Sequence, residues 1–301
     1  MTHPQIVFHI GAHKTATTHL QHSIGAVADL LAMEGVNFFG PQSLRGPGKR
    51  LEARFDLPFN PRKSLADTRP AAVVLDEMTQ GAHRLVLSEE NFIGILFDKD
   101  TDGPLYRIGA PLYPQAGPRL DALAARIAPE GVDICLGLRA PAGFLTSAYG
   151  QALLAEVVVS EERFRNQNPM GSVDWVDLVA RLRSARGVRT ITVWRQEEYH
   201  ALFPRILAAM LGPASHHVAP VAQRVNPGLS RAAVDVVLKL HGAGQRGPLA
   251  HHARDTLPIG PDTPAFQLFG PEDAALSAEF YAAQWDEIGG MEGVTVLKPV
   301  G

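Results

Sequence analysis

The strongest indication of the fold is the segment Val7-Phe-His-Ile-Gly-Ala-His-Lys-Thr-Ala-Thr-Thr-His-Leu-Gln21. It passes from an apolar run through a short polar loop into a helical pattern that begins near Thr17. Backbone N–H groups at a helix N-terminus have no partner within the helix, and the helix dipole is positive there, so such a turn binds phosphate-like anions. Lys14 adds a positive charge, and Thr15, Thr17 and Thr18 add hydroxyl donors. The segment therefore predicts an anion-binding loop between a strand and a helix.

This loop differs from the nucleotide-triphosphate loop Gly-x-x-x-x-Gly-Lys-Ser/Thr. Aligned from Gly11, the second glycine is replaced by Ala16, the lysine by Thr17, and the last position is Thr18. The lysine that would reach a γ-phosphate is missing, and Lys14 stands earlier in the loop instead. The pattern therefore argues against hydrolysis of ATP or GTP.

Outward from this loop, short apolar runs alternate with helical patterns, which is typical of an α/β fold. Strands are predicted at Gln5–Ile10, Arg84–Leu87, Val132–Leu138 and Thr190–Trp194. Helices are predicted at about 17–33, before Gly81, and at about 120–127, 143–155, 173–183, 199–211, 230–241 and 272–288. The expected architecture is one domain over residues 1–301, with three layers and a central, mainly parallel sheet flanked by helices.

Two segments interrupt the alternation. Residues 44–70 are rich in Pro, Gly and Arg, and residues 242–270 carry His251-His252, Arg254 and several prolines. Neither segment reads as a linker, because regular patterns resume after each. Long loops in compact domains are often functional, so both are candidate acceptor-binding flaps, with solvated surface excursions as the alternative.

Composition limits the partners of the chain. The formal net charge is −3, so the overall charge gives no general attraction to nucleic acid or anionic membranes. The hydrophobic share of 46% is enough for a sizeable core. No run approaches the ~18 apolar residues of a membrane helix, and the N-terminus has no basic signal-peptide region. The single cysteine, Cys135, fits a reducing cytoplasm, and its apolar neighbours predict a buried structural thiol. Nothing in the sequence indicates an oligomeric state.

The segment His13–Gln21 resembles the 5′-phosphosulfate loop of sulfotransferases that use 3′-phosphoadenosine 5′-phosphosulfate (PAPS), particularly bacterial members with His-Lys-Thr-Gly-Thr-Thr-x-Leu-Gln. The resemblance implies an enzyme with PAPS as co-substrate and no required metal, and a fold like that of P-loop proteins. The expected donor-binding residues here are His13, Lys14, Thr15, Ala16, Thr17 and Thr18, with Lys14 also catalytic. Ala16 replaces the glycine of the family, and alanine costs energy if this position needs a positive φ.

A second motif follows the strand at 132–138. Arg139 leaves the end of that strand, where ligands collect in open parallel sheets, and Ser147 lies in the following helix. In sulfotransferases an arginine and a serine eight positions apart clamp the 3′-phosphate of PAPS, and Arg139 and Ser147 match this spacing. The planar fork of arginine suits phosphate. A later segment, Gln223-Arg224-Val-Asn226, is similar to the Arg-x-Asn of a basic loop in bacterial members, so Arg224 is a further donor-binding candidate. Ser230 is expected to cap a helix instead.

Ser88-Glu89-Glu90-Asn91 follows the strand at 84–87. Related bacterial sequences carry a similar string, and some carbohydrate sulfotransferases use a glutamate there as general base. By that resemblance Glu90 is the expected base, with Glu89 in reserve and His13 and His9 as rivals; His9 alternates within a strand and is expected to be packed. The alternative is that Ser88 caps a helix whose first turn carries the acids.

The predicted function is sulfuryl transfer from PAPS to a hydroxyl acceptor, a small molecule or a glycan, with a carbohydrate or glycolipid favoured by the resemblance. Two alternatives remain: a P-loop kinase or NTPase, and a non-catalytic anion- or glycan-binding protein on the same fold. None of the 12 histidines has zinc-site spacing.

Overall fold

The structure is a computed structural model that describes residues 4–97, 106–128, 130–222 and 227–299. Its six strands form one sheet in the order β2-β3-β1-β4-β5-β6, and all neighbouring pairs are parallel. The strands are β1 (Gln5–Gly11), β2 (Val36–Phe39), β3 (Arg84–Ser88), β4 (Val132–Leu138), β5 (Val188–Arg195) and β6 (Val294–Val296).

Helices connect the strands, as parallel pairing requires. The α-helices are α1 (Thr17–Gly25), α2 (Ala28–Met33), α3 (Pro41–Leu44), α4 (Leu51–Arg54), α5 (Ala71–Thr79), α6 (Ala116–Ile127), α7 (Pro141–Leu154), α8 (Glu161–Gln167), α9 (Trp175–Ser184), α10 (Tyr199–Leu211), α11 (Arg231–Gly242), α12 (Leu249–Thr256) and α13 (Pro271–Gly289). Short 3-10 helices are η1 (Lys63–Leu65), η2 (Glu90–Phe92), η3 (Met170–Ser172), η4 (Gln196–Glu198) and η5 (Gly212–His217).

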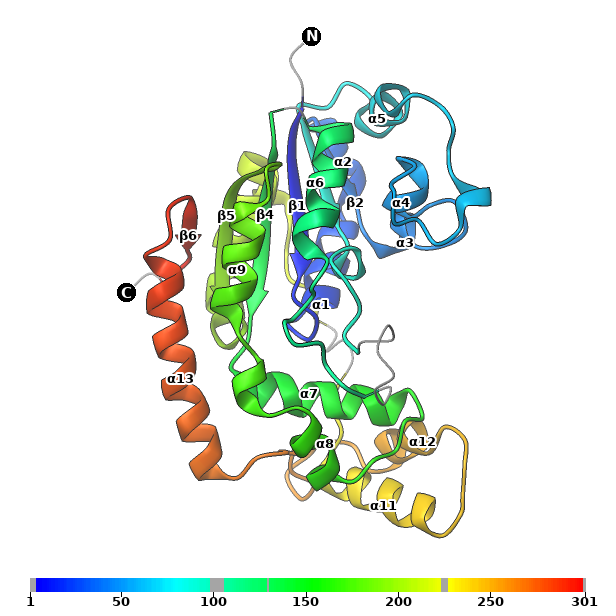
Figure 1. The fold of residues 1–301 in the computed structure, drawn as a ribbon, viewed down its shortest axis with the longest axis vertical. Helices are drawn as coiled ribbons and strands as arrows, with labels where there is room; N and C mark the ends of the chain where they lie inside the picture. Colours follow the sequence, from blue (N-terminus) through cyan, green and yellow to red (C-terminus); the bar gives the residue numbers. More distant parts are fainter. Residues whose placement is uncertain (1–3, 98–105, 129, 223–226, 300–301) are drawn as a thin grey trace.

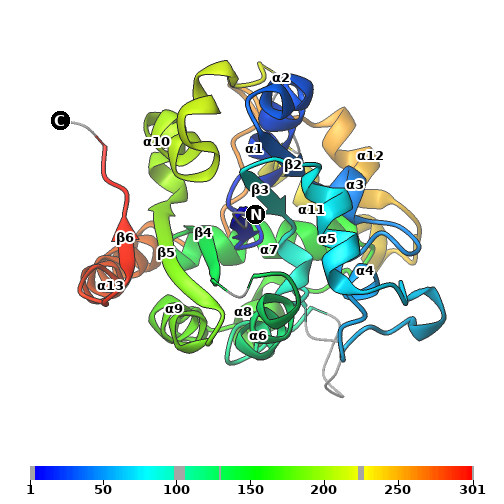
Figure 2. The same cartoon turned by 90° about the horizontal axis from the view of Figure 1, so that it is seen from above.

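Helices cover both faces of the sheet. Figure 2 shows α1, α2 and α10 on one face and α6 and α9 on the other. Successive strand residues point to opposite faces, so Ile6, Phe8 and Ile10 join one buried cluster while Val7 joins the other. Burial on both faces explains why the strands read as continuous apolar runs. The fold is a three-layer α/β fold with a parallel sheet, as the sequence predicts.

The carboxyl ends of all six strands lie at one rim of the sheet. Helix α7 crosses below this rim in Figure 1. Strand β1 is bordered by β3 and β4, so the loops that follow these three strands meet at the rim. Ligands of open parallel sheets bind where neighbouring strands connect in opposite directions, and here the chain passes from β3 across β1 to β4. The rim beside β1 is therefore the place to look for a site.

Most predicted elements are confirmed, and the bounds of β4 and α10 agree with the predicted ones. The single helix predicted to about Met33 is wrong: α1 ends at Gly25, and Val27, with φ −124°, leaves the helical conformation before α2 begins. Strands β2 and β6, which have four and three residues, were not predicted. Short edge strands gain their stability from pairing with a neighbour and carry little periodicity of their own. Helices α8 and α12 were also missed.

The two interrupting segments contain regular structure. Residues 44–70 include α4 and η1, and residues 242–270 include α12. Cys135 is 2% exposed, and burial raises the pKa of its thiol to about 12, which confirms a buried structural cysteine. Ser230 accepts a hydrogen bond from the Ala233 amide and caps α11 as predicted. No helix in the described ranges is long and apolar enough to cross a membrane.

Candidate functional site

The loop between β1 and α1 is anchored to the neighbouring strand. The Ala12 amide donates to the Gly137 carbonyl of β4 at 2.9 Å, and the Thr15 hydroxyl donates to the Ala12 carbonyl at 2.6 Å. A β-carbon at Gly137 would lie 3.0 Å from Thr15 Oγ1, so this glycine makes room for the loop. Thr15 thus stabilises the loop with its hydroxyl.

Two residues of this loop are left-handed. Lys14 has φ 67° and Ala16 has φ 64°, and Ala16 is the N-cap of α1. Alanine has no side-chain acceptor, so it leaves the first amides of α1 uncapped by its own side chain. Ala16 thus has the positive φ at which alanine costs energy.

We expect Ala16→Gly to stabilise the fold by about 1 kcal/mol, because glycine adopts the left-handed region without the steric cost that alanine carries. Urea unfolding at neutral pH measures the change. The matched control is Ala274→Gly in the exposed, right-handed part of α13, which should lower the free energy of unfolding by about 0.5–1 kcal/mol. A destabilising Ala16→Gly would contradict the assignment of strain.

Lys14 and Arg139 lie together beside the loop. Arg139 Nη1 donates to the Lys14 carbonyl at 3.1 Å, and Lys14 Nζ donates to Gln151 Oε1 at 3.3 Å. Burial, together with the positive charge of Arg139, lowers the pKa of Lys14 to about 8, against the opposing charge of Glu90. Burial also lowers the pKa of Arg139. Within the described ranges neither side chain forms a salt bridge, so two cations face each other without a neutralising carboxylate in contact.

Helix α7 places Ser147 on the same surface. A β-carbon at Gly143 would lie 3.1 Å from Arg139 Nε, so the guanidinium packs over this glycine. Gly143, Ser147 and Gln151 are spaced four residues apart and share one helix face. Arg139 packs over Gly143 and Lys14 contacts Gln151, so Ser147 lies between these two side chains on the helix face. The structure brings the residues of both predicted motifs to one stretch of the rim, whereas Arg224 lies outside the described residues.

His13 is fully engaged in contacts. Its Nδ1 lies 2.9 Å from Tyr113 Oη, its Nε2 lies 3.1 Å from Asn91 Oδ1, and its ring stacks on Tyr113. Burial lowers its pKa, although the bond to Asn91 opposes this shift. His9 is held by Ser88 Oγ at 2.8 Å and stacks on Trp194, and burial lowers its pKa to about 4. His9 is packed and hydrogen-bonded as predicted, and both ring nitrogens of His13 already have partners.

The two carboxylates after β3 share one arginine. Arg45 binds Glu89 with two hydrogen bonds, Nε–Oε2 at 2.7 Å and Nη2–Oε1 at 2.8 Å, and its Nη2 also reaches Glu90 Oε1 at 2.8 Å. The side chains of Glu89 and Glu90 are 8% and 12% exposed. Burial is the largest single effect and would raise the pKa of Glu90, but the charge of Arg45, a backbone hydrogen bond, the charge of His13 and the hydrogen bond from Arg45 together outweigh it and lower that pKa. Gln21 Nε2 also donates to Glu90 at 3.2 Å, so Glu90 is held as a carboxylate.

Glu90 touches the anion loop. A β-carbon at Gly11, where φ is 103°, would lie 2.9 Å from the Glu90 β-carbon. The alternative in which Ser88 caps a helix is wrong: Ser88 bonds His9 and Gln21, and Glu89 caps η2 by accepting from the Asn91 amide at 3.0 Å. Glu90 is thus the carboxylate of the pair that adjoins the loop.

We expect Arg45→Gln to lower the free energy of unfolding by about 1–2 kcal/mol at neutral pH. The effect is no larger because solvent screens the charge of the half-exposed Arg45. The pKa of Glu90 then rises, since the charge of Arg45, the largest of the effects that oppose burial, is gone. Because a carboxyl whose pKa is lowered by folding stabilises the fold above its unfolded value near 4.5, the difference between variant and parent should shrink as pH falls from that value through the lower folded pKa. Urea unfolding across pH measures it. Lys63→Gln, at the exposed pair with Asp56, is the control and should change little.

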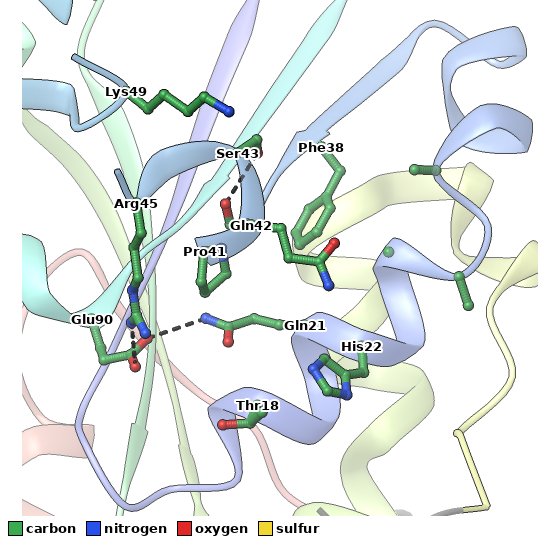
Figure 3. A pocket seen from close by; sticks show the side chains of 14 residues that line it. Thr18, Gln21, His22, Phe38, Pro41, Gln42, Ser43, Arg45, Lys49 and Glu90 are labelled. Atoms are coloured by element: carbon green, nitrogen blue, oxygen red, sulfur yellow. Dashed lines mark hydrogen bonds and ion pairs between the residues drawn. The ribbon is translucent and has the colours of Figure 1, made fainter. Parts of the chain in front are cut away.

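A cavity of about 740 Å³ opens beside Glu90. Figure 3 shows it between α1, the end of β2, α3 and the segment that carries Arg45. Thr18 and Gln21 of α1 and Glu90 line it, so it adjoins the anion loop. It occupies the β2–β3 side of β1, whereas Arg139 and Ser147 lie on the β4 side.

Several contacts of this region were not predicted. Arg45 was placed in a basic loop without a partner, and the contact of Tyr113 with His13 was missed. Neither contact has a local signal, because each joins segments far apart in the sequence. Gln21 and Gln151 belong to the quoted motifs, but their bonds to Glu90 and Lys14 depend on the fold.

No family model matches the chain, and no curated protein matches its sequence. Among solved structures, the chain is similar to the crystal structure of a sulfotransferase from Alicyclobacillus acidocaldarius, with 16% identity, a TM-score of 0.41, and coverage of 75% of this chain and 88% of that one. A likeness of this size identifies no reaction.

Proposed function

We propose that this chain is a sulfotransferase that moves a sulfuryl group from PAPS to a hydroxyl acceptor. The observation that carries the proposal is the pairing of Lys14 and Arg139, two cations joined through the Lys14 carbonyl, neither of which forms a salt bridge in the described part of the chain. Their mutual repulsion is relieved when an anion binds between or beside them. A nucleotide with charge at both its 5′ and 3′ ends fits two cations on separate loops.

The proposed donor site has two halves. The loop amides at Ala16 and Thr17 and the ammonium of Lys14 bind the 5′-phosphosulfate, as anions bind at helix N-termini. Arg139 and Ser147 bind the 3′-phosphate, and the Ser147 hydroxyl has no hydrogen-bond partner among the described residues. This half supplies position for the reaction and takes no part in bond making.

In the proposed transfer, the acceptor oxygen forms a bond to sulfur while the bond from sulfur to the bridging phosphate oxygen breaks. Negative charge grows on that bridging oxygen, where Lys14 stabilises it. The acceptor hydroxyl loses its proton to Glu90, which Arg45 and Gln21 hold as a carboxylate. The products are a sulfate ester and adenosine 3′,5′-bisphosphate. Because both ring nitrogens of His13 already have partners, Glu90 is the better candidate for the base.

Calorimetry with adenosine 3′,5′-bisphosphate tests the proposal directly. We expect binding in the micromolar range or tighter that does not change when Mg²⁺ is removed, and weaker binding of ATP with or without Mg²⁺. Preference for ATP with Mg²⁺ would favour the kinase alternative instead. Bisphosphate binding without transfer to any hydroxyl acceptor would favour a non-catalytic binding protein.

A further inference from the structure

The lining of the cavity beside Glu90 is mixed. Its apolar part consists of the ring of Phe38, Pro41 and the small residues Gly25, Ala26 and Ala28. Its polar part carries amides, hydroxyls and charges, from Thr18, Gln21, Gln42, Ser43, Arg45 and Glu90. Figure 3 shows the side chains of Phe38 and Gln42 on the side of the cavity opposite Gln21 and His22 of α1. The cavity is amphipathic, with its carboxylate at the end nearest the anion loop.

The inner end disfavours an anionic ligand. Arg45 is the cation at this end, and it already binds Glu89 and Glu90. Because both carboxylates already neutralise this guanidinium, Arg45 offers no free positive charge to a carboxylate or sulfate placed beside the reacting hydroxyl. Lys49, the other cation of the lining, is exposed and lies farther along the cavity in Figure 3.

The polar part of the lining can bind ligands that carry hydroxyl groups. A hydroxyl both donates and accepts, and side-chain amides offer both functions to it. Gln42 forms no side-chain hydrogen bond with any described residue, and the Gln21 amide nitrogen is used while its oxygen has no bond to a described residue. Ser43 donates to the Gly40 carbonyl and still has lone pairs to accept. Several hydroxyls on one ligand could be bound here at once.

We infer that this cavity is the acceptor site and that the acceptor is a neutral saccharide, a class that resemblance alone had only favoured. This inference rests on the proposed function and adds the substrate class. A sugar ring has an apolar face for Phe38 and a rim of hydroxyls for Gln42 and Ser43, which matches a lining that offers both kinds of group. The volume of about 740 Å³ lies within the range of small-molecule sites and admits a short oligosaccharide. One sugar hydroxyl then reaches Glu90.

The test is transfer from ³⁵S-labelled PAPS to an array of neutral glycans, with uronic-acid glycans, 4-nitrophenol and 1-decanol beside them. We expect label on one or more neutral glycans. For the best of them, Gln42→Ala and Phe38→Ala should each raise KM about 10-fold with little change in kcat, since each loses roughly one contact of about 1.4 kcal/mol. Glu287→Ala, exposed on α13, is the control and should leave KM unchanged.

Each other outcome overturns the inference. Label on only the uronic-acid glycans, the phenol or the alkanol would show another acceptor class. A glycan KM unchanged in both cavity variants would place the acceptor elsewhere. An array without any label, from a protein that binds adenosine 3′,5′-bisphosphate, would overturn the saccharide inference and favour the non-catalytic alternative, whereas failure to bind the bisphosphate would overturn the proposed donor site itself. Bisphosphate affinity in Gln42→Ala and Phe38→Ala confirms that each variant is folded.

Discussion

Lys14→Ala is expected to lower the turnover of sulfuryl transfer by about 10²–10³-fold, the usual effect of losing one group that stabilises developing charge. The substitution leaves the left-handed backbone as it is, because alanine and lysine have the same steric preference at φ 67°. Single-turnover rates with saturating PAPS measure the loss. A variant that kept its parent's rate would remove Lys14 from the reaction.

The pKa of Lys14 gives this prediction a second readout. Because that pKa is lowered to about 8, Lys14 is largely charged at neutral pH and loses its charge above about pH 8. The affinity for adenosine 3′,5′-bisphosphate should therefore fall between about pH 8 and pH 10, and binding in that range should take up a proton. Lys14→Arg stays charged and should bind with little dependence on pH there. Calorimetry in buffers of different ionisation enthalpy measures the proton uptake.

Arg139→Ala is expected to weaken binding of adenosine 3′,5′-bisphosphate by about 1.5–3 kcal/mol, or roughly 10–150-fold, the worth of hydrogen bonds to a charged group. With bound donor at saturation, turnover should change less than affinity, since Arg139 positions the nucleotide away from the transferred group. Arg163→Ala, which removes the same charge from the exposed surface of α8, is the matched control. Equal affinity in both variants would mean that the 3′-phosphate is bound elsewhere.

Gly143→Ala tests the same half of the site without removing a charge. The new β-carbon would lie 3.1 Å from Arg139 Nε and push the guanidinium away from the face that it shares with Ser147. Alanine also favours a helix interior by about 1 kcal/mol over glycine, so the fold should gain or keep stability while bisphosphate affinity falls several-fold. Loss of both properties together would indicate a packing defect instead. Thermal unfolding and calorimetry on one sample separate the two cases.

Local patterns predicted the parts of this protein whose causes are local. Apolar runs that are buried on both faces predicted four of the strands, and β4 agrees residue for residue. The loop before α1 follows from a strand, a polar turn and a helix start in one short segment. The shared surface of Arg139 and Ser147 was predicted by resemblance to the arginine and serine of sulfotransferases, since Arg139 itself precedes α7.

The remaining parts depend on chain segments that only folding brings together. Arg45 meets Glu89 and Glu90 across more than forty residues, and no periodicity indicates which arginine of the 44–70 segment turns inward. The left-handed conformation of Ala16 is likewise set by the packing of the loop against β4, against the preference of alanine itself.

Local sequence patterns predicted a parallel α/β fold and a loop at its rim with the residue types of an anion site, since hydrophobic periodicity and helix-end chemistry act over a few residues. Which groups face one another there follows from the tertiary structure: Lys14 and Arg139, which form no salt bridge with a described residue, the carboxylate of Glu90 held by Arg45, and the cavity of mixed lining beside it. Charge, burial and cavity shape depend on distances in space, which separation along the chain does not fix.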